Sequence, residues 1–307
     1  IDICKPLIIC NEAHRFLVAE QCAQSMIDVN KIILEPKGRN TAPALTVACL
    51  ELVEQYDDAI LIMMPADHVI TDISAFHTLI KAAHGIAKQD YLVTFGINPE
   101  KPETGYGYIH AGEKINDNMG IAIHHLNEFK EKPDLSTAEA YLNSGNYFWN
   151  SGIFMMKASV WLEKINEFNP DISNACQKAH KAAEIDGFFF RLDEQAFLSS
   201  PSDSIDYAVM EKLADSDYEK LAVIPADIGW SDVGAWSSVW ELHEKDQQGN
   251  YIEGDVIAND TENCFIRSER GLITSIGCRD MVIVDSDDAM MIEDKNRAKD
   301  VKKIEET

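Results

Sequence analysis

Two aspartates stand where carboxylates could bind a metal ion. Asp67 follows the most apolar run of the sequence, and Asp232 lies in the segment 229–236. A carboxylate at the end of a central strand can hold Mg²⁺ on a triphosphate, because Mg²⁺ takes only one or two protein carboxylates and completes its shell with phosphate and water. Either residue could instead have a local role, Asp67 in a turn and Asp232 as a helix N-cap.

Three other segments carry groups that suit a hydroxyl-rich, phosphorylated ligand. Glu131 can accept hydrogen bonds from sugar hydroxyls, and the adjacent Lys132 can meet a phosphate. The amide of Asn150 can both donate and accept, which fits vicinal hydroxyls. Gly107 lies between two tyrosines, where a missing side chain lets a ligand approach the backbone closely. Each segment could equally be an ordinary turn.

The segment 35–43 (EPKGRNTAP) lies between a predicted strand and a predicted helix. Backbone N–H groups at the start of a helix suit an anion or the polar edge of a base. Arg39 and Asn40 add several directed donors. The alternative is an ordinary turn, with Thr41 as the helix cap.

Strand-like and helix-like stretches alternate in the part of the chain that would position these groups. Strands are predicted at residues 7–9, 31–34, 59–63 and 91–95, and helices at 12–26, 41–55 and 74–89. This order predicts an α/β fold with a doubly wound sheet, whose ligands bind at the carboxyl ends of the strands. A looser mixture of strands and helices follows after Gly105, with a helix predicted at 158–168.

The character of the sequence changes near residue 247. Short apolar runs separated by turn residues follow, and they predict a small all-β domain, a short solenoid. We therefore expect two domains, an α/β domain over residues 1–246 and a β-rich domain over residues 247–307.

Composition limits the partners. The chain has 27 Lys and Arg against 52 Asp and Glu, a net charge of −25. Nucleic acid is therefore excluded as an expected partner, since a phosphate backbone requires a basic face. A small phosphorylated substrate is compatible with this charge if a cation such as Mg²⁺ is bound locally.

Membrane and export signals are missing from the sequence. No apolar run approaches the roughly 20 residues of a membrane helix, so no membrane partner is expected. The 7 cysteines form no CxxC pair. Together with the absence of a secretory signal, they predict reduced thiols in a cytoplasmic protein.

Taken in order, these segments resemble the sugar-nucleotide pyrophosphorylases, most closely their mannose-1-phosphate guanylyltransferase (GDP-mannose pyrophosphorylase) branch. The matching stretches are NEAHRFLVAEQ, EPKGRNTAPA, MPADHVI, VTFGINPEKPETGYGYI, FKEKPD, YFWNSGIF, SIDYAVMEK, GWSDVGAWSSVWE and GDVIANDTENCFIRSERG. They cover almost the whole chain. The resemblance implies a Rossmann-like nucleotidyltransferase domain with a mixed central sheet, followed by a short left-handed β-helix.

The resemblance also implies roles for residues. Asp67 and Asp232 would hold Mg²⁺, and with Lys132 they would form the catalytic set. Mannose would be held by Gly107, Glu131 and Asn150, and Lys132 would meet its phosphate. The residues near the nucleotide would be Arg39, Asn40, Thr41, Pro65, Ala66 and Asp67.

The implied reaction is attack by a phosphate oxygen of mannose 1-phosphate on the α-phosphorus of GTP. It gives GDP-mannose and pyrophosphate. The nucleophile is ionised at neutral pH, so catalysis would rest on alignment and charge neutralisation rather than on a catalytic histidine or cysteine. The forms EPKGRNTAPA and WNSG favour guanine and mannose.

One feature of the family has no counterpart in this sequence. Its first strand leads into a glycine-rich loop of the form GxGxRLxPLSR, followed by PKQ, which wraps the triphosphate. We expect that loop to precede Ile1, because residues 6–11 already read as a strand in mid-fold.

Two alternatives remain open at this point. One is synthesis of another sugar nucleotide, such as dTDP-glucose or ADP-glucose. The other is a non-catalytic sugar-nucleotide-binding or assembly subunit. A β-rich tail with exposed edges is also compatible with a homodimer.

Overall fold

The computed structural model describes residues 3–118 and 120–297. The chain folds into two compact units, the first made of residues 1–65 and 72–228 and the second of residues 66–71 and 229–307. The second unit is therefore built from two separate stretches of the chain. The predicted division at residues 246 and 247 stays a prediction.

A four-stranded sheet opens the first unit. Its order is β1 (Leu7–Asn11), β2 (Lys31–Glu35), β10 (Phe189–Arg191) and β9 (Glu184–Asp186), and only β9 runs antiparallel to its neighbour. Successive residues of β2 face opposite sides. Ile32 and Leu34 pack with residues of α1 (Arg15–Gln24), and Ile33 packs into the main core. β2 is therefore covered on both faces, which explains its continuous apolar run.

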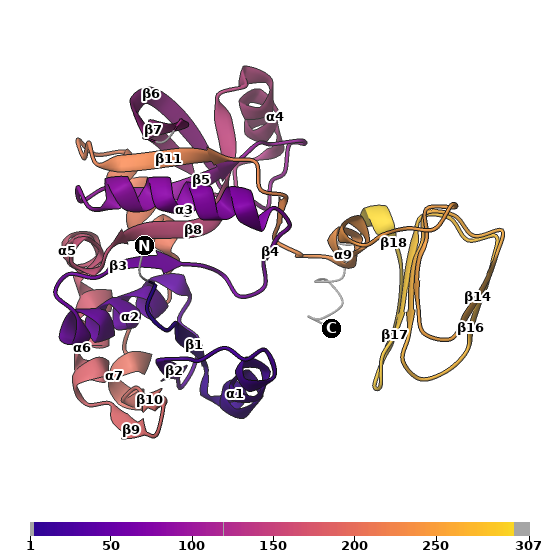
Figure 1. Ribbon diagram of the computed structural model, residues 1–307, viewed down its shortest axis with the longest axis horizontal. Coiled ribbons are helices and arrows are strands. Elements are labelled where there is room, and N and C mark those ends of the chain that lie inside the picture. Colours follow the sequence, from indigo (N-terminus) through magenta and orange to yellow (C-terminus); the bar gives the residue numbers. More distant parts are fainter. Residues whose placement is uncertain (1–2, 119, 298–307) are drawn as a thin grey trace. The chain divides into compact units, whose positions relative to one another are not determined.

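A six-stranded mixed sheet forms the centre of the first unit (Figure 1). Its order is β3 (Ile60–Met63), β8 (Tyr147–Lys157), β5 (Leu92–Ile97), β11 (Leu221–Ala226), β7 (Ile121–Lys130) and β6 (Tyr108–Asn118). β8 runs antiparallel to β3 and to β5, whereas β11 runs parallel to β5. The mixed central sheet implied by the resemblance is confirmed.

The first strands are divided between two sheets, not joined in one as the alternating order suggested. β1 and β2 belong to the four-stranded sheet, and β3 and β5 belong to the six-stranded sheet. The antiparallel β8 lies between β3 and β5. Local sequence patterns carry no information on such a long-range pairing. β1 and β3 each end their sheet and present an unpaired edge within the described residues.

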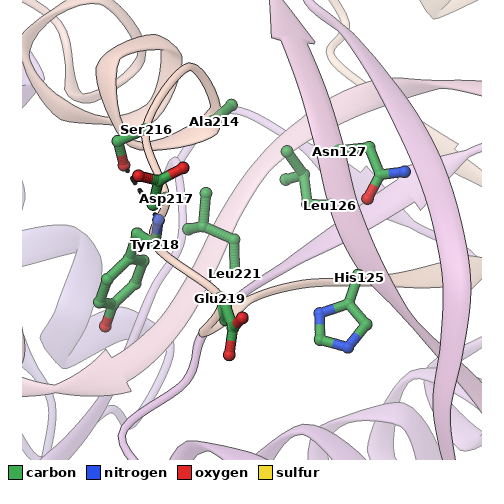
Figure 2. A pocket seen from close by; sticks show the side chains of 9 residues that line it. All are labelled: His125, Leu126, Asn127, Ala214, Ser216, Asp217, Tyr218, Glu219 and Leu221. Atoms are coloured by element: carbon green, nitrogen blue, oxygen red, sulfur yellow. Dashed lines mark hydrogen bonds between the residues drawn. The ribbon is translucent and has the colours of Figure 1, made fainter.

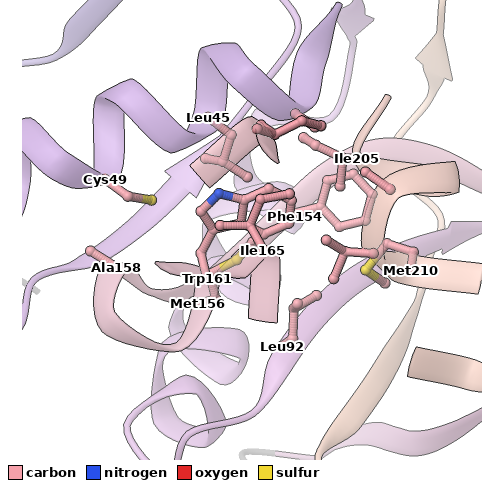
Figure 3. Close-up of a cluster of buried hydrophobic side chains, with 14 of the residues drawn as sticks. Leu45, Cys49, Leu92, Phe154, Met156, Ala158, Trp161, Ile165, Ile205 and Met210 are labelled. Atoms are coloured by element: carbon pink, nitrogen blue, oxygen red, sulfur yellow. The ribbon is translucent and has the colours of Figure 1, made fainter. Parts of the chain in front are cut away.

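Helices cover both faces of the six-stranded sheet. α3 (Ile73–Ala87) lies along one face, where Phe76 meets Phe95 of β5 edge to face at 6.0 Å. The main core occupies the other side, with α2 (Thr41–Gln55), α5 (Ala158–Phe168) and α6 (Pro170–Lys181) (Figure 3). Trp161 is fully buried at its centre and donates Nε1–H to Thr46 Oγ1 at 3.0 Å.

Shorter helices complete the first unit. They are η1 (Glu12–His14), α4 (Leu135–Ser144), α7 (Glu194–Leu198), η2 (Asp206–Met210) and α8 (Glu211–Ala214). η2 is a π-helix that runs directly into α8. Single π-turns inside helices occur frequently at functional sites.

The second unit is a small two-sheet solenoid preceded by one helix, α9 (Trp236–Leu242). One sheet has the order β13 (Tyr251–Glu253), β15 (Phe265–Ser268), β17 (Met281–Asp285) and β18 (Met290–Asp294), and the other pairs β14 (Val256–Asn259) with β16 (Ile273–Ile276). From β13 to β17 the chain alternates between the sheets, with parallel pairing in each.

Apolar side chains fill the interior of this solenoid. Ile266 and Ile283 of one sheet, with Cys264 just before β15, pack with Val256 and Ile273 of the other. The predicted β-helix-like architecture is confirmed. Among the described residues, no helix has the length and apolar character that crossing a membrane requires.

Candidate functional site

The predicted sugar-binding residues come together at the start of β6. Tyr108, the first residue of β6, pairs with Lys130 of β7 on one side and with Trp149 of β8 on the other. The next residues along these strands are therefore neighbours: Asn150 donates its backbone N–H to the carbonyl oxygen of Gly107 at 2.8 Å. Glu131, Lys132 and Asn150 thus surround Gly107, although they are far apart in the sequence.

Gly107 is required by this close approach. A Cβ atom at this position would lie 2.4 Å from Glu131 Oε2 and 3.4 Å from the Cβ of Asn150. The first distance is far below van der Waals contact. Only glycine lets the Glu131 carboxylate occupy its present place.

Glu131 and Lys132 form an ion pair at this site. Lys132 Nζ lies 2.6 Å from Glu131 Oε1, and the Glu131 residue is only 9% exposed. The hydrogen bond that Lys132 donates to Glu131 raises the pKa of Lys132, so the ammonium group remains charged. The side chain of Lys132 is 56% exposed, which leaves it accessible to a phosphate.

A residue to which the sequence assigned no role, Asp206, belongs to the same cluster. Asn150 Nδ2 donates to Asp206 Oδ1 at 2.9 Å. Burial and then the charge of Glu131 raise the pKa of Asp206 to about 7. Asp206 lies in the stretch SIDYAVMEK, which had matched the family. An acidic residue at the start of an apolar helical run was the signal that could have identified it.

The predicted nucleotide segment joins β2 to α2. Asn40 has a φ of +69° and caps α2 by accepting the Thr41 N–H at 2.8 Å. Arg39 donates through Nη2 to the carbonyl oxygen of Leu198, and within the described residues its buried Nε has no partner. The Nη2 group of the guanidinium is therefore fixed, and its Nε–H is available as a hydrogen-bond donor.

This segment is tied to the loop that carries Asp206. The Thr41 hydroxyl accepts the N–H of Ile205 at 2.9 Å, and Ala42 donates its N–H to the carbonyl oxygen of Asp203 at 3.1 Å. The two hydrogen bonds connect the nucleotide segment to the sugar cluster within the first unit.

Glu35, at the carboxyl end of β2, is a buried acid. It is 9% exposed, and its Oε1 atom has no partner in the part of the chain that the structure describes. Burial raises the pKa of Glu35 to about 7. Sequence reasoning included Glu35 in the nucleotide segment but gave it no role.

The two predicted metal-binding aspartates lie in the second unit. β4 (Val69–Ile70) pairs antiparallel with β12 (Trp230–Ser231), with Val69 opposite Ser231. Asp67 precedes β4 and Asp232 follows β12, so both lie at the same end of this short ladder. The side chain of Asp67 is 84% exposed, and Asp232 Oδ1 accepts the N–H of Gly234 at 3.3 Å. Pro65 ends a stretch of the first unit, whereas Ala66 begins the second.

Backbone strain marks the segment that carries Asp232. Val233 has a φ of +49°, which is a true outlier for a β-branched residue. Asn40 and Lys132 also have positive φ values, +69° and +47°. Residues held in such conformations concentrate at functional sites, and each of the three lies in or beside a segment singled out from the sequence.

A cavity of about 500 Å³ lies elsewhere in the first unit (Figure 2). It is lined by His125, Leu126, Asn127, Ala214, Ser216, Asp217, Tyr218, Glu219 and Leu221. Leu221 pairs with Leu92 at the start of β5, whereas Asn150 pairs with Gly96 near its end. The cavity and the sugar cluster therefore lie near opposite ends of β5. None of the predicted site residues lines the cavity.

A buried ionic network links α2, α6 and β2. His180 Nε2 lies 3.0 Å from Glu51 Oε2, its Nδ1 lies 3.7 Å from Glu54 Oε1, and Lys31 forms an ion pair with Glu51. A metal ion at Glu51, Glu54 and His180 would have to compete with the ammonium group of Lys31. We interpret the network as a structural link.

Two family models match the chain. The nucleotidyl transferase model matches residues 1–249, and a model described as a MannoseP isomerase/GMP-like β-helix domain matches residues 254–306. Together they cover almost all of the sequence.

Curated relatives are similar over nearly the whole chain. "Mannose-1-phosphate guanylyltransferase" of Escherichia coli K12 is 47% identical over 98% of this chain and 62% of its own length. "Xanthan biosynthesis protein XanB" of Xanthomonas campestris is 48% identical over 97% of this chain and 62% of its own length. The chain thus spans less than two thirds of the length of these relatives.

A solved structure has a similar fold. It is titled as a "mannose-1-phosphate geranyltransferase" from Thermus thermophilus and superposes with a TM-score of 0.82 at 26% identity. The superposition covers 98% of this chain and 83% of the other.

Proposed function

We propose that the chain, which belongs to the nucleotidyl transferase family, transfers a guanylyl group from GTP to α-D-mannose 1-phosphate. The products are GDP-mannose and pyrophosphate. Relatives named mannose-1-phosphate guanylyltransferase, 47% and 46% identical over 98% of the chain, support this choice of substrates.

The observation that carries the proposal is the cluster around Gly107. It brings together a buried carboxylate, Glu131, and an exposed ammonium group, Lys132, at 2.6 Å. A hexose phosphate needs this combination, because its hydroxyls donate to a carboxylate and its dianionic phosphate attracts a cation. In the proposal, Glu131 binds the sugar and Lys132 orients the phosphate that attacks GTP.

The nucleotide is assigned to Arg39, Asn40 and Thr41 with Pro65, Ala66 and Asp67. The spare Nε–H of Arg39 supports this assignment, since it is a buried donor without a partner in the described chain. Buried donors are almost always satisfied, by protein, by water or by a ligand.

A divalent metal ion, which we propose to be Mg²⁺, is assigned to Asp67 and Asp232. Two carboxylates beside one strand ladder fit this assignment, because Mg²⁺ prefers oxygen ligands and needs few of them from the protein. When bound, the ion would neutralise charge on the α-phosphate and the leaving pyrophosphate.

The protein would also contribute to catalysis by aligning the phosphates of the two substrates. The attacking phosphate oxygen is ionised at neutral pH, so no residue has to remove a proton from it. The family's catalytic advantage would then come from holding the two phosphates in line and from countering their charge. The proposed cytoplasmic location agrees with seven cysteines that form no disulfide.

The test is pyrophosphate release by the natural full-length protein with GTP and mannose 1-phosphate, with and without Mg²⁺. Parallel assays replace GTP by ATP, dTTP or UTP and mannose 1-phosphate by glucose 1-phosphate. Turnover that requires GTP, mannose 1-phosphate and Mg²⁺ is the expected result.

Other outcomes are equally informative. Turnover with another nucleotide and sugar would transfer the proposal to a different sugar nucleotide. Binding of GDP-mannose without any turnover would favour a sugar-nucleotide-binding subunit.

A further inference from the structure

The side-chain amide of Asn150 forms most of its hydrogen bonds inside the protein. Its Oδ1 atom accepts the backbone N–H of Gly152 at 3.2 Å. It also lies 3.1 Å from the Thr94 hydroxyl, whose single hydrogen is shared with the carbonyl oxygen of Ile153 at 3.1 Å. Its Nδ2 atom donates to Asp206 Oδ1 at 2.9 Å. An amide oxygen has two acceptor positions and an amide nitrogen has two donors. Both acceptor positions of the oxygen therefore face donors inside the protein, and one N–H remains.

These partners allow only one orientation of the amide. A flip would place the Nδ2 hydrogens against the Gly152 N–H and would place Oδ1 against the Asp206 carboxylate. Both contacts would be repulsive. Oxygen and nitrogen of an amide are assigned from such partners, and here donors on one side and a carboxylate on the other give the same answer.

Asp206 is itself surrounded by groups of the proposed site. The charges that act on it are those of Glu131 and Lys132, and Tyr207 and Glu211 are the neighbouring titratable groups on its own helical segment. The loop before it is fixed by the hydrogen bond between Thr41 and Ile205. Asp206 thus has a defined position, with one hydrogen bond to Asn150 and another to Ser204.

We propose that Asp206 is a positioning residue that holds the Asn150 amide so that its one remaining N–H faces the hexose phosphate. This inference rests on the proposed function and deepens it. Asn150 then acts toward the sugar only as a donor to an oxygen atom. It does not read a pair of vicinal hydroxyls, which would need its oxygen as well.

The decisive experiment exchanges the two side chains. In the variant Asn150→Asp/Asp206→Asn, the new aspartate still accepts from Thr94 and Gly152, and the new asparagine donates to it. The contacts of position 150 with Thr94, Gly152 and position 206 are retained, with the bond between the two exchanged side chains reversed in polarity, and the number of carboxyl groups is unchanged. Only the N–H that faces the ligand is lost.

The measurements are the thermal midpoint and the dissociation constants of mannose 1-phosphate and GTP, determined by calorimetry on the full-length protein. We expect Asn150→Asp alone to lower the midpoint at pH 8, because Asp206, whose pKa is about 7, is then ionised and two carboxylates face each other, and the exchange to restore it. In the exchange variant, mannose 1-phosphate should bind at least about tenfold more weakly, with GTP affinity within about twofold of wild type.

Single variants at Asp206 separate positioning from folding. Asp206→Ala removes the acceptor and should weaken mannose 1-phosphate binding by about tenfold, whereas Asp206→Asn keeps an acceptor oxygen and should stay within about threefold. Asp215→Asn, at an exposed residue directly after α8, is the control and should leave both affinities unchanged.

Two results would overturn the inference. One is an exchange variant that binds mannose 1-phosphate as tightly as wild type. The other is Asp206→Ala with unchanged affinity. A wild-type protein that binds GTP but no hexose 1-phosphate would overturn the proposed function as well, so the two failures are distinguishable.

Discussion

At the residue scale, the cluster around Gly107 is held together by contacts between residues that are far apart in the sequence. Gly107, Glu131, Lys132 and Asn150 were chosen for their types, and the structure brings them together. Asp206 was not predicted, because its contact with the cluster is a hydrogen bond to a residue 56 positions away. Residue types can be read from a sequence, but the occupancy of each donor and acceptor cannot.

Substitution of Gly107 tests the crowding at the sugar cluster. In Gly107→Ala the new methyl group would displace the Glu131 carboxylate, from which its Cβ is separated by only 2.4 Å. We expect the KM for mannose 1-phosphate to rise at least about tenfold, with little change in the KM for GTP. Gly271→Ala is the control, since a Cβ there meets no atom within 4 Å. Equal effects of the two substitutions would contradict the assignment.

The aspartates of the second unit test the metal assignment. Asp67→Asn and Asp232→Asn should each lower kcat by about two or more orders of magnitude, because an amide is a much weaker ligand for Mg²⁺ than a carboxylate. Raising the Mg²⁺ concentration should recover part of the loss. Asp227→Asn, which alters another exposed aspartate, should have no effect. Unchanged turnover in either test variant would remove that residue from the metal site.

Glu35 predicts a pH dependence of stability. Its pKa is raised from 4.5 to about 7 in the folded protein, so between these values the folded state holds a proton that the unfolded state has lost. Stability therefore falls as pH rises from about 4.5 to 7 and is constant above. Glu35→Gln should be more stable than wild type at pH 8 by on the order of 2–3 kcal/mol, with little difference at pH 4.5.

Chemical denaturation at the two pH values measures this effect. A stability difference that is the same at pH 4.5 and pH 8 would show that ionisation of Glu35 is not its cause.

At the element scale, local patterns predicted many of the elements in their order but not their long-range pairing. The predicted bounds of the helices at 41–55 and 158–168 agree with the structure. α6 was missed, although Pro170 at its first turn and the spacing of Ile172, Ala175, Cys176 and Ala179 were a readable signal. The insertion of β8 between β3 and β5 had no local signal, since pairing partners are chosen by the whole fold.

The link between α2 and the loop before η2 can be tested through one hydroxyl. Thr41→Val removes the acceptor of the Ile205 N–H, which should cost about 1–2 kcal/mol of folding free energy. Because Asp206 follows directly, mannose 1-phosphate should also bind more weakly. Thr41→Ser keeps the hydroxyl and should restore both properties. A valine variant with wild-type stability and affinity would mean that the hydrogen bond fixes neither segment.

At the scale of the whole molecule, charge is the dominant feature. A net charge of −25 on 307 residues implies considerable self-repulsion in the folded state. Added salt screens this repulsion, so the thermal midpoint should rise as NaCl is increased from about 20 to 200 mM. Equal additions of a neutral osmolyte at the same osmolality provide the control. A midpoint that falls with salt would show that attractive ion pairs outweigh the net repulsion.

The second unit also has a genetic consequence. Because it combines residues 66–71 with residues 229–307, a recombination or splitting of the gene between codons 228 and 229 would separate Asp67 from Asp232. The β-helix could be exchanged among relatives as one contiguous block from residue 229, which would carry Asp232 but leave Asp67 behind. A chimera made at this junction would keep the proposed metal pair only if the parent that supplies residues 1–228 encodes Asp67 and the parent that supplies residues 229–307 encodes Asp232.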